Sequence, residues 1–510
     1  MFSVGQAVLQ SWSVPPAASL ALVLAAIAYL RGWILMRRAR VPFVPAWRAI
    51  CFLLGLLTLW VALASPLDTF SGFLITAHML QHMLLMMVAP PLLLLGAPLI
   101  PLVRGLPLFA AREFAGPFLN WRAAVRVGHA LTNLWVALVV MGSAMFAWHT
   151  PRLYELALAS SSWHEFEHAC FFVASLIFWW PVVQPWPSRA RAQRWMLVPY
   201  LLIGDLQNTV LSAILVFSDR VLYPSYEKMP RLFGISALHD QAASGAVMWV
   251  VGSLAFVVPA VVIAVQCLSS GSAWRRELPL PSARSSSFAA LRSLAAFLAW
   301  PRQRLGARRV EALSFVVWFA VAGISLAALA GRPSDDDDQA LRMRASSGPF
   351  AVAVFTAPGD LPAGSNSFSV VVQDSETQRV LPEAIVELTA RSAGGGREAA
   401  AVRAGPDDSN KLLQSGELDL PAGDWSLLIK VRRGANTADF ALPLKVVKPK
   451  GGFALPWPWR VLAIFAVVLL LAYWRRHRAP PVVSAGAAAR AGEGGHAGKD
   501  DRYAGVEARG

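Results

Sequence analysis

Long apolar runs alternate with short, arginine-rich segments along the first half of the chain. The windows 17–36, 50–65, 79–100 and 134–149 contain one charged side chain between them, Arg31. A helix needs about 20 apolar residues to cross a bilayer, whereas a buried strand is much shorter. The pattern therefore predicts a polytopic α-helical membrane protein.

We expect nine membrane spans, the first seven of which form one membrane core over residues 1–267. The predicted spans cover residues 15–36, 47–65, 76–100, 129–149, 164–185, 195–217, 243–267, 311–330 and 457–474. A basic loop, 268–310, separates spans seven and eight. The tail 475–510 is rich in alanine, glycine and charge, which is typical of disorder. Pro90 and Pro91 are expected to break the hydrogen-bond ladder of span three and to bend it.

Arginine clusters follow every second span, as at Arg37, Arg104 and Arg189, and the intervening loops are poor in arginine and lysine or balanced by acids. Cytoplasmic loops carry the excess of positive charge. The alternation therefore puts the loop 268–310 and the tail 475–510 in the cytoplasm and the N-terminus outside. Because no basic region precedes span one, we expect a retained anchor rather than a cleaved signal peptide.

Composition and charge distribution argue against nucleic-acid binding and against a disulfide-rich fold. Hydrophobic residues make up 56% of the 510 residues, charged residues 15%, and the mean hydropathy is +0.48. The net charge of +15 would suit nucleic acid, but the arginines lie in short loops between spans rather than on one soluble face. We therefore expect membrane lipid and no nucleic acid as a partner. The three cysteines have no paired spacing, so they predict no disulfide framework.

Segment 332–450 has a different pattern, with short alternating stretches such as SFSVVVQD, AIVELTA, WSLLIKVR and FALPLKVV separated by glycine, proline and asparagine. Period-two patterning with regular turn residues predicts a small β-sandwich. The topology puts this domain outside the cytoplasm, tethered by spans eight and nine. It contains no His, Cys or Met from residue 345 to 452. We therefore expect it to bind a protein partner rather than a metal ion.

The candidate chemistry lies in histidines that the topology gathers at the outer membrane face. Six of the nine histidines share that face: His78, His82, His149, His164, His168 and His239. His129 begins span four on the opposite side and is excluded. Ionisable residues near hydrocarbon are costly, so they are functional candidates. A single histidine at a helix end is usually an interfacial or hydrogen-bonded residue, but six from four segments predict a metal site.

Two of these histidine pairs are four residues apart, His78 with His82 and His164 with His168. Residues i and i+4 share one face of a helix. Each pair can therefore hold one ion, or the two pairs can face each other across a helix bundle.

Imidazole suits copper, zinc, iron and nickel, and nearby methionine thioethers favour Cu(I). Met79 and Met83 are therefore further candidates beside the histidines. Asp240, which follows His239 directly, is another polar candidate. Asp205 lies midway along span six, where a bare carboxylate is costly. It is either a hydrogen-bonded structural residue or part of a metal or proton path.

The histidines belong to a specific series of motifs. The run HMLQHMLLMMVAPPLLLLGAP is followed in order by WHTPRLYELAL, HEFEHACFFVASLIFWWP and HDQAASGAVMWV. Over residues 15–267 these motifs resemble the CtaG family of caa(3)-type cytochrome c oxidase assembly proteins. The resemblance implies a polytopic protein of the bacterial plasma (inner) membrane that is required to form active haem–copper oxidase. Segment 332–450 weakly resembles YtkA/FixH-like modules linked to copper and oxidase assembly.

We therefore expect a non-enzymatic assembly factor that binds copper at the outer face and delivers it to cytochrome c oxidase subunits, with a periplasmic copper chaperone as a further partner. A haem-binding membrane cytochrome is an alternative, because facing histidines also ligate haem. A copper transporter is another, although the candidate ligands crowd one face. No nucleophile–base set, phosphate loop or acid pair indicates an enzyme.

Overall fold

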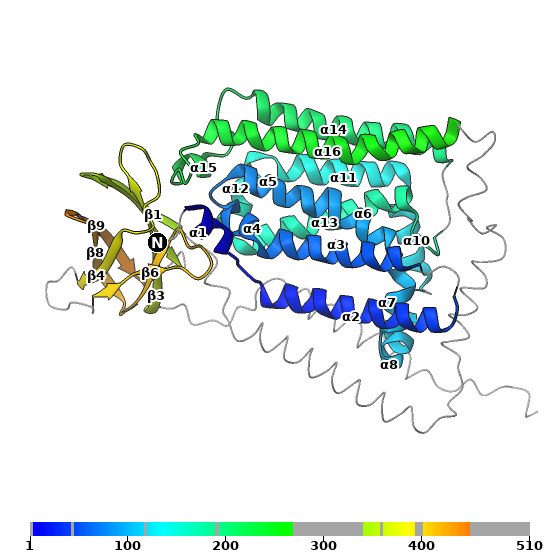
Figure 1. Cartoon of the computed structure of the whole chain (residues 1–510), viewed down its shortest axis with the longest axis horizontal. Helices are drawn as coiled ribbons and strands as arrows, with labels where there is room; N and C mark the ends of the chain where they lie inside the picture. The colour runs from blue at the N-terminus through cyan, green and yellow to red at the C-terminus, as the bar shows by residue number, and fades with distance from the viewer. Residues whose placement is uncertain are drawn as a thin grey trace, which may run out of the picture. The chain divides into compact units, whose positions relative to one another are not determined.

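Membrane-length helices make up the N-terminal half of the computed structural model, which describes residues 4–41, 45–116, 119, 121–188, 193–268, 340–357, 361–392 and 401–448 (Figure 1). Within these described ranges, six helical stretches are long and apolar enough to cross a membrane, and a bent helix pair makes up to seven. They are α2 (Pro16–Arg38), α3 (Ala46–Ala64), the continuous stretch Ile75–Leu95, α13 (Ser161–Val183), α14 (Leu197–Phe217, which η3, Arg194–Met196, precedes) and α16 (Ala237–Leu268), with the bent pair α10 (Arg122–Leu131) and α11 (Leu134–Trp148). The predicted membrane core is confirmed.

Shorter helices connect these spans. They are α1 (Val4–Gln10), α4 (Pro66–Ser71), α7 (Leu99–Gly105), α8 (Leu108–Ala110), the π-helical turn η2 (Ala111–Ala115), α12 (Pro151–Ala159) and α15 (Pro224–Lys228). Several begin at a proline, which has the right φ for the first turn of a helix and lacks the N–H that would be unpaired there.

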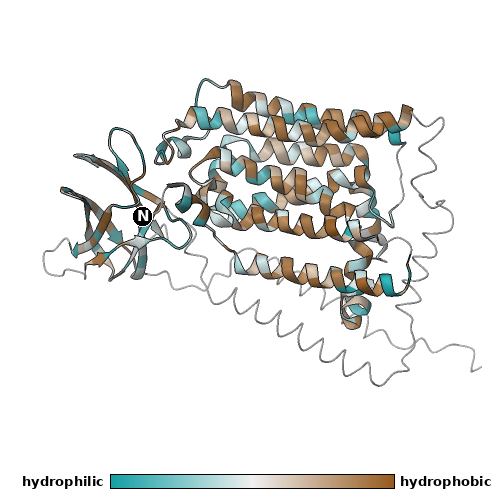
Figure 2. Cartoon of the chain, in the orientation of Figure 1, coloured by the Kyte–Doolittle hydropathy of each residue, from teal (hydrophilic) through white to brown (hydrophobic). Residues whose placement is uncertain are grey.

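Apolar residues follow one another along most of α14 and α16 (Figure 2), and many of them are exposed on the outside of the helices. Leu206 and Phe217 on α14 are exposed, as are Val250, Leu254 and Val261 on α16. In water such a surface would aggregate, but in a bilayer it faces hydrocarbon at no cost. The exposed apolar faces therefore support the membrane assignment independently of helix length.

The third span changes its winding before Pro90. It consists of α5 (Ile75–Met83), the π-helical turn η1 (Leu84–Val88) and α6 (Ala89–Leu95). Proline has no N–H, so Pro90 cannot bond the carbonyl of Met86 four residues earlier. That carbonyl instead accepts hydrogen bonds from Ser175 Oγ and from Trp179 Nε1, the latter at 3.1 Å. The predicted break is confirmed, and it fixes the third span against α13.

The fourth span is shorter than predicted. Asn133 caps α11, because its side-chain oxygen accepts a hydrogen bond from Trp135 N at 3.0 Å, and α10 is bent by 72° from α11 at this point. His129 therefore lies in α10, before the bend, rather than at the start of a straight span from 129 to 149.

The separate C-terminal domain consists of antiparallel β-strands in two sheets. The larger sheet has the order β1-β2-β3-β7-β6 and the smaller one β5-β4-β8-β9. The strands are β1 (Ala340–Ser347), β2 (Phe350–Ala357), β3 (Gly364–Asp374), β4 (Ile385–Ser392), β5 (Val402–Arg403), β6 (Gly405–Pro406), β7 (Gln414–Leu420), β8 (Gly423–Arg433) and β9 (Asn436–Val446). Alternating residues of both sheets form one apolar core. The predicted antiparallel β-domain is confirmed.

Strand β2 is buried along its whole length and so lacks the alternation of its neighbours. One of its faces joins the core of the domain. Phe355 on the other face makes an edge contact with Phe73, at the end of the helical region where α5 begins, with ring centroids 5.7 Å apart. Gln373 Nε2 donates a hydrogen bond to Arg231 O at 2.9 Å. The β-domain therefore contacts the end of the helical core at which α5 starts.

Several predictions fall outside the described residues. They are the loop 268–310, the spans 311–330 and 457–474, the tail 475–510 and the acidic start of the segment 332–450.

Candidate metal centre

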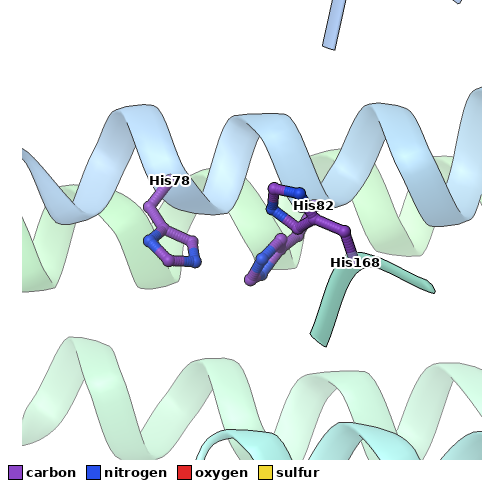
Figure 3. Close-up of side chains that lie close together, drawn as sticks. All are labelled: His78, His82 and His168. Atoms are coloured by element: carbon purple, nitrogen blue, oxygen red, sulfur yellow. The ribbon is translucent and has the colours of Figure 1, made fainter. Parts of the chain in front are cut away.

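Helices α5 and α13 bring two histidine pairs together. The ring centroids of His78 and His82 on α5 lie 4.3 Å apart, and those of His164 and His168 on α13 lie 4.2 Å apart. Across the two helices, His78 and His164 are 5.0 Å apart and His82 and His168 are 5.4 Å apart. The side chains of His78, His82 and His168 gather between the helices (Figure 3). The i, i+4 spacing thus produces two facing pairs in one cluster.

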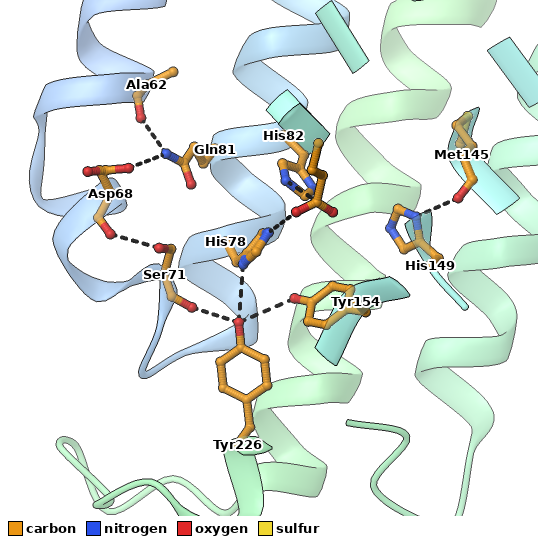
Figure 4. Close-up of polar contacts among 11 residues, drawn as sticks. Ala62, Asp68, Ser71, His78, Gln81, His82, Met145, His149, Tyr154 and Tyr226 are labelled. Atoms are coloured by element: carbon orange, nitrogen blue, oxygen red, sulfur yellow. Dashed lines mark hydrogen bonds and ion pairs between the residues drawn. The ribbon is translucent and has the colours of Figure 1, made fainter. Parts of the chain in front are cut away.

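A fifth histidine joins this cluster from a third helix. His149 is the C-cap residue of α11, and its ring centroid lies 6.4 Å from that of His82. Its Nδ1 lies 2.8 Å from Met145 O (Figure 4). A carbonyl oxygen can only accept, so Nδ1 carries the proton and Nε2 is left with its lone pair. This hydrogen bond therefore selects the ring form in which Nε2 can bind a metal ion.

The cluster contains buried nitrogens that have no hydrogen-bond partner among the described residues. His78, His82, His149 and His168 are buried and His164 is half-buried. The unpartnered nitrogens are Nε2 of His78, His82, His149, His164 and His168, and Nδ1 of His82. A buried polar atom without a partner costs free energy, and so many in one place are typical of a ligand-binding site. A metal ion bound by imidazole fits this donor set.

Tyr226 on α15 sets the ring form of His78. Its hydroxyl donates to Ser71 O at 2.6 Å, and its oxygen lies 3.2 Å from His78 Nδ1 and 3.3 Å from the Tyr154 hydroxyl (Figure 4). Burial raises the pKa of both tyrosines well above the usual value, so both phenols stay neutral. Since the one proton of Tyr226 goes to Ser71, His78 Nδ1 must donate, and its Nε2 faces the cluster with a free lone pair.

Glu167 completes the cluster, and our sequence analysis missed it. Its Oε2 lies 3.6 Å from His78 Nε2, and its Oε1 lies 3.9 Å from His82 Nε2. The motif HEFEH contained the signal, because residues i, i+3 and i+4 share one helix face. Glu167 therefore lies with His164 and His168, whereas Glu165 is exposed. The Glu167 carboxyl group beside the imidazoles is a further potential donor of an oxygen ligand.

Helix α5 is held in place by a buried amide between its two histidines. Gln81 is fully buried, and its Nε2 donates to Ala62 O at 2.8 Å and to Asp68 Oδ1 at 2.7 Å (Figure 4). These bonds link α5 to α3 and α4. They fix the rotation of α5 about its axis and so direct His78 and His82 toward α13.

Asp240 is a positioning residue in this structure. Leu74 occupies the N-cap position of α5 and offers no side-chain acceptor. The Asp240 carboxylate on α16 accepts instead from Ile75 N at 2.7 Å and from Thr76 N at 3.2 Å. Neither group of potential metal ligands among the described residues includes Asp240. It therefore supports the helix that carries His78 and His82.

We expect Asp240→Ala to destabilise the protein by about 2 kcal/mol, because it removes an N-cap and leaves buried N–H groups unpaired. The copper binding that the sequence predicts for His78 and His82 should fall with it, since α5 loses its first turn. Thermal unfolding in detergent measures the first effect and copper content the second. Asp219→Ala, which removes an exposed carboxylate near the end of α14, is the control and should behave like the parent. Equal melting temperatures of the two variants would contradict the capping role.

The other predicted candidates lie apart from the cluster. His239 is exposed, and its backbone N–H bonds Ser236 Oγ. Asp205 accepts a hydrogen bond from Ser253 Oγ at 2.7 Å, which favours its structural interpretation. Met79 and Met83 are buried in the apolar core on the neighbouring face of α5. The structure therefore gathers five of the six predicted histidines.

These features define a class of protein, a polytopic membrane protein whose helices carry a buried, imidazole-rich cluster with the donor atoms for a metal ion. Within that class, residues 27–270 match the model of the Caa3_CtaG family, which is described as cytochrome c oxidase caa3 assembly factor. This match confirms the resemblance that the sequence motifs predict, over the residues that it covers.

Three curated relatives are each similar to about half of the chain. An uncharacterized protein of Mycobacterium leprae is 26% identical over 257 residues, which are 47% of this chain and 37% of the relative. Uncharacterized proteins of Mycobacterium bovis and Mycobacterium tuberculosis are each 26% identical over 273 residues, 51% of this chain and 40% of each relative. The chain thus spans about two fifths of the length of these relatives. No solved structure matches it significantly.

Proposed function

We propose that this protein is a membrane-embedded assembly factor that binds copper at the histidine cluster and delivers it to a subunit of a haem–copper cytochrome c oxidase. One observation carries the proposal. Five histidines from three helices converge beside a carboxylate, and the buried Nε2 of each has no hydrogen-bond partner among the described residues. They lie within the stretch that matches an oxidase assembly family. Copper is the cargo here, and the protein has no catalytic role of its own.

The donor set supports a transition metal, and the family supports copper among the transition metals. Imidazole binds copper, zinc, iron and nickel, whereas calcium and magnesium require oxygen ligands. His78 and His149 have the second hydrogen bond that metal-binding imidazoles usually make, to Tyr226 and to Met145 O respectively. The match to oxidase assembly factors then favours copper, because a haem–copper oxidase requires it.

The orientation follows from the charge of the loops. Arginines after alternate spans support an orientation in which α5 and α13 start on the outer side of the bacterial inner membrane. Copper would then be exchanged with a periplasmic chaperone and with the oxidase on that side. The contacts of the β-domain with Phe73 and Arg231 support its presence at the same end, where it would dock a partner.

Packing within the cluster favours a bare ion over the alternative of haem. Neighbouring rings lie directly against one another, with His78 stacked on Tyr154 at 5.1 Å and His82 against Phe171 at 4.7 Å between centroids. A porphyrin between facing imidazoles would have to displace these aromatic side chains. A metal ion requires only small movements of the imidazoles.

Metal content tests the proposal. Protein purified anaerobically with a reductant from copper-supplemented cells should contain copper by elemental analysis and show no Soret absorption. His239→Ala changes an exposed histidine outside the cluster and should retain the same copper content. Copper-free protein with a Soret band would replace the assembly-factor proposal with a membrane cytochrome.

A further inference from the structure

The cluster contains two groups of donor atoms that overlap in one histidine. The first is His78, His82 and His168, and the second is His78, His164 and Glu167. Within each group the donor atoms all lie within 4.8 Å of one another. His78 has only one nitrogen for both groups, because its Nδ1 bonds Tyr226. The lone pair of that nitrogen can bind one ion at a time, so the two groups define two alternative positions for a metal ion that share His78.

The two groups lie at different depths. His78 precedes His82 by one turn of α5, and His164 precedes His168 by one turn of α13, which is about 6 Å along each helix. The second group therefore lies nearer the ends at which α5 and α13 begin. His164 is half-buried, whereas all three members of the first group are buried. Of the two groups, the second alone therefore includes a partly exposed residue.

Glu167 gives the second position a charge that the first lacks. It is buried, and neither of its oxygens has a hydrogen-bond partner among the described residues. The ion-pair partners described for it are the imidazoles of His78 and His82 rather than a lysine or arginine. A carboxylate inside a membrane protein without a strong partner is costly. A bound cation would remove this cost.

We propose that His78, His164 and Glu167 form a second metal position, which takes a divalent transition-metal ion. The proposal rests on the metal-binding role of the cluster and adds a site with its own selectivity. Two imidazoles and one carboxylate are a donor set found in zinc and iron(II) proteins. The carboxylate also neutralises one of the two positive charges, which three neutral imidazoles cannot do.

Zinc binding to metal-stripped, full-length protein tests the second position. The variant His82→Ala/His168→Ala removes the first group and leaves the second intact, so it should still bind one Zn²⁺ per chain in equilibrium dialysis. Adding Glu167→Gln should weaken Zn²⁺ binding by roughly 10- to 100-fold or more. That is the range for losing a residue that only hydrogen-bonds a ligand, and Glu167 would be a ligand itself. Adding Glu165→Gln, two residues away and exposed, should change nothing.

His164→Ala in the same background is a second route to the result, since this half-buried side chain is easier to remove without unfolding. It should weaken Zn²⁺ binding as Glu167→Gln does. The second position is wrong if the His82→Ala/His168→Ala variant binds no Zn²⁺, or if neither added substitution weakens binding. In either case the copper content of the parent still decides the proposed function. Glu167-dependent Zn²⁺ binding in a protein that retains no copper would support the second position and refute the copper proposal.

Discussion

His82→Ala and His168→Ala are each expected to leave about a tenth or less of the parent's copper in protein purified anaerobically with a reductant. Both side chains belong to the buried, all-imidazole group, so either loss leaves too few nitrogens to replace the hydration shell of the ion. The amount of active oxidase in cells that depend on the variant should fall in parallel. Elemental analysis and oxidase activity of membranes are the two measurements.

The fold should survive both substitutions. Helices in lipid satisfy their own backbone groups, and a lost imidazole leaves only a small gap. The variants should therefore insert at normal levels and melt near the parent's temperature. His129→Ala, which changes an exposed histidine of α10, is the control and should keep its copper. Full copper content and oxidase assembly in both cluster variants, or an equal loss in the control, would refute the site.

Helix length and the facing histidine pairs could be predicted because each follows from a local rule. Apolar runs of about 20 residues require a span in lipid, and the spacing of His78 with His82 and of His164 with His168 requires a shared face. Pro90 likewise implied a freed carbonyl. The partners of that carbonyl, Ser175 and Trp179, come from another helix and could not be read from α5 alone.

The remaining features of the site depend on contacts between distant segments. Tyr226 lies 148 residues from His78, which it orients, and Asp240 lies 165 residues from Ile75, which it caps. No periodicity within one segment reveals such pairs. His239 is a candidate that the sequence analysis included and the structure leaves outside the cluster. Topology gives the membrane side of a residue but not the direction of its side chain around the helix axis, and this side chain is exposed.

Glu167 was a different omission, because the sequence contained the information. A charged residue near hydrocarbon is costly whatever its type. The second acid in HEFEH, Glu167, shares a helix face with both histidines of that motif. A search for histidine alone therefore found the imidazoles and missed the carboxylate. Searching a helix face for every possible ligand type would have included it.

Gly105→Ala is expected to destabilise the membrane core by about 3 kcal/mol or more, because the added methyl group has no space. A Cβ at Gly105 on α7 would lie 1.6 Å from the backbone carbonyl oxygen of Ala28 on α2. The approach is reciprocal, since a Cβ at Gly32 on α2 would lie 1.8 Å from Pro101 O on α7. Both obstacles are backbone atoms, so no side-chain rotation relieves the clash. Close contact of helix backbones through small residues is a common basis of packing in membranes.

Thermal unfolding in detergent should show a clear fall in melting temperature for Gly105→Ala and for Gly32→Ala, with less folded protein in the membrane. Gly128→Ala in α10 is the matched control, because nothing lies within 4 Å of its added Cβ, and it should gain up to about 1 kcal/mol of helix stability. The folded fraction of Gly105→Ala should still bind copper, since neither Gly105 nor Gly32 is in the histidine cluster.

The variants His82→Ala and His168→Ala should show the opposite combination, a normal melting temperature with little bound copper. A Gly105→Ala protein that melts with the parent would disprove the close packing of α2 on α7.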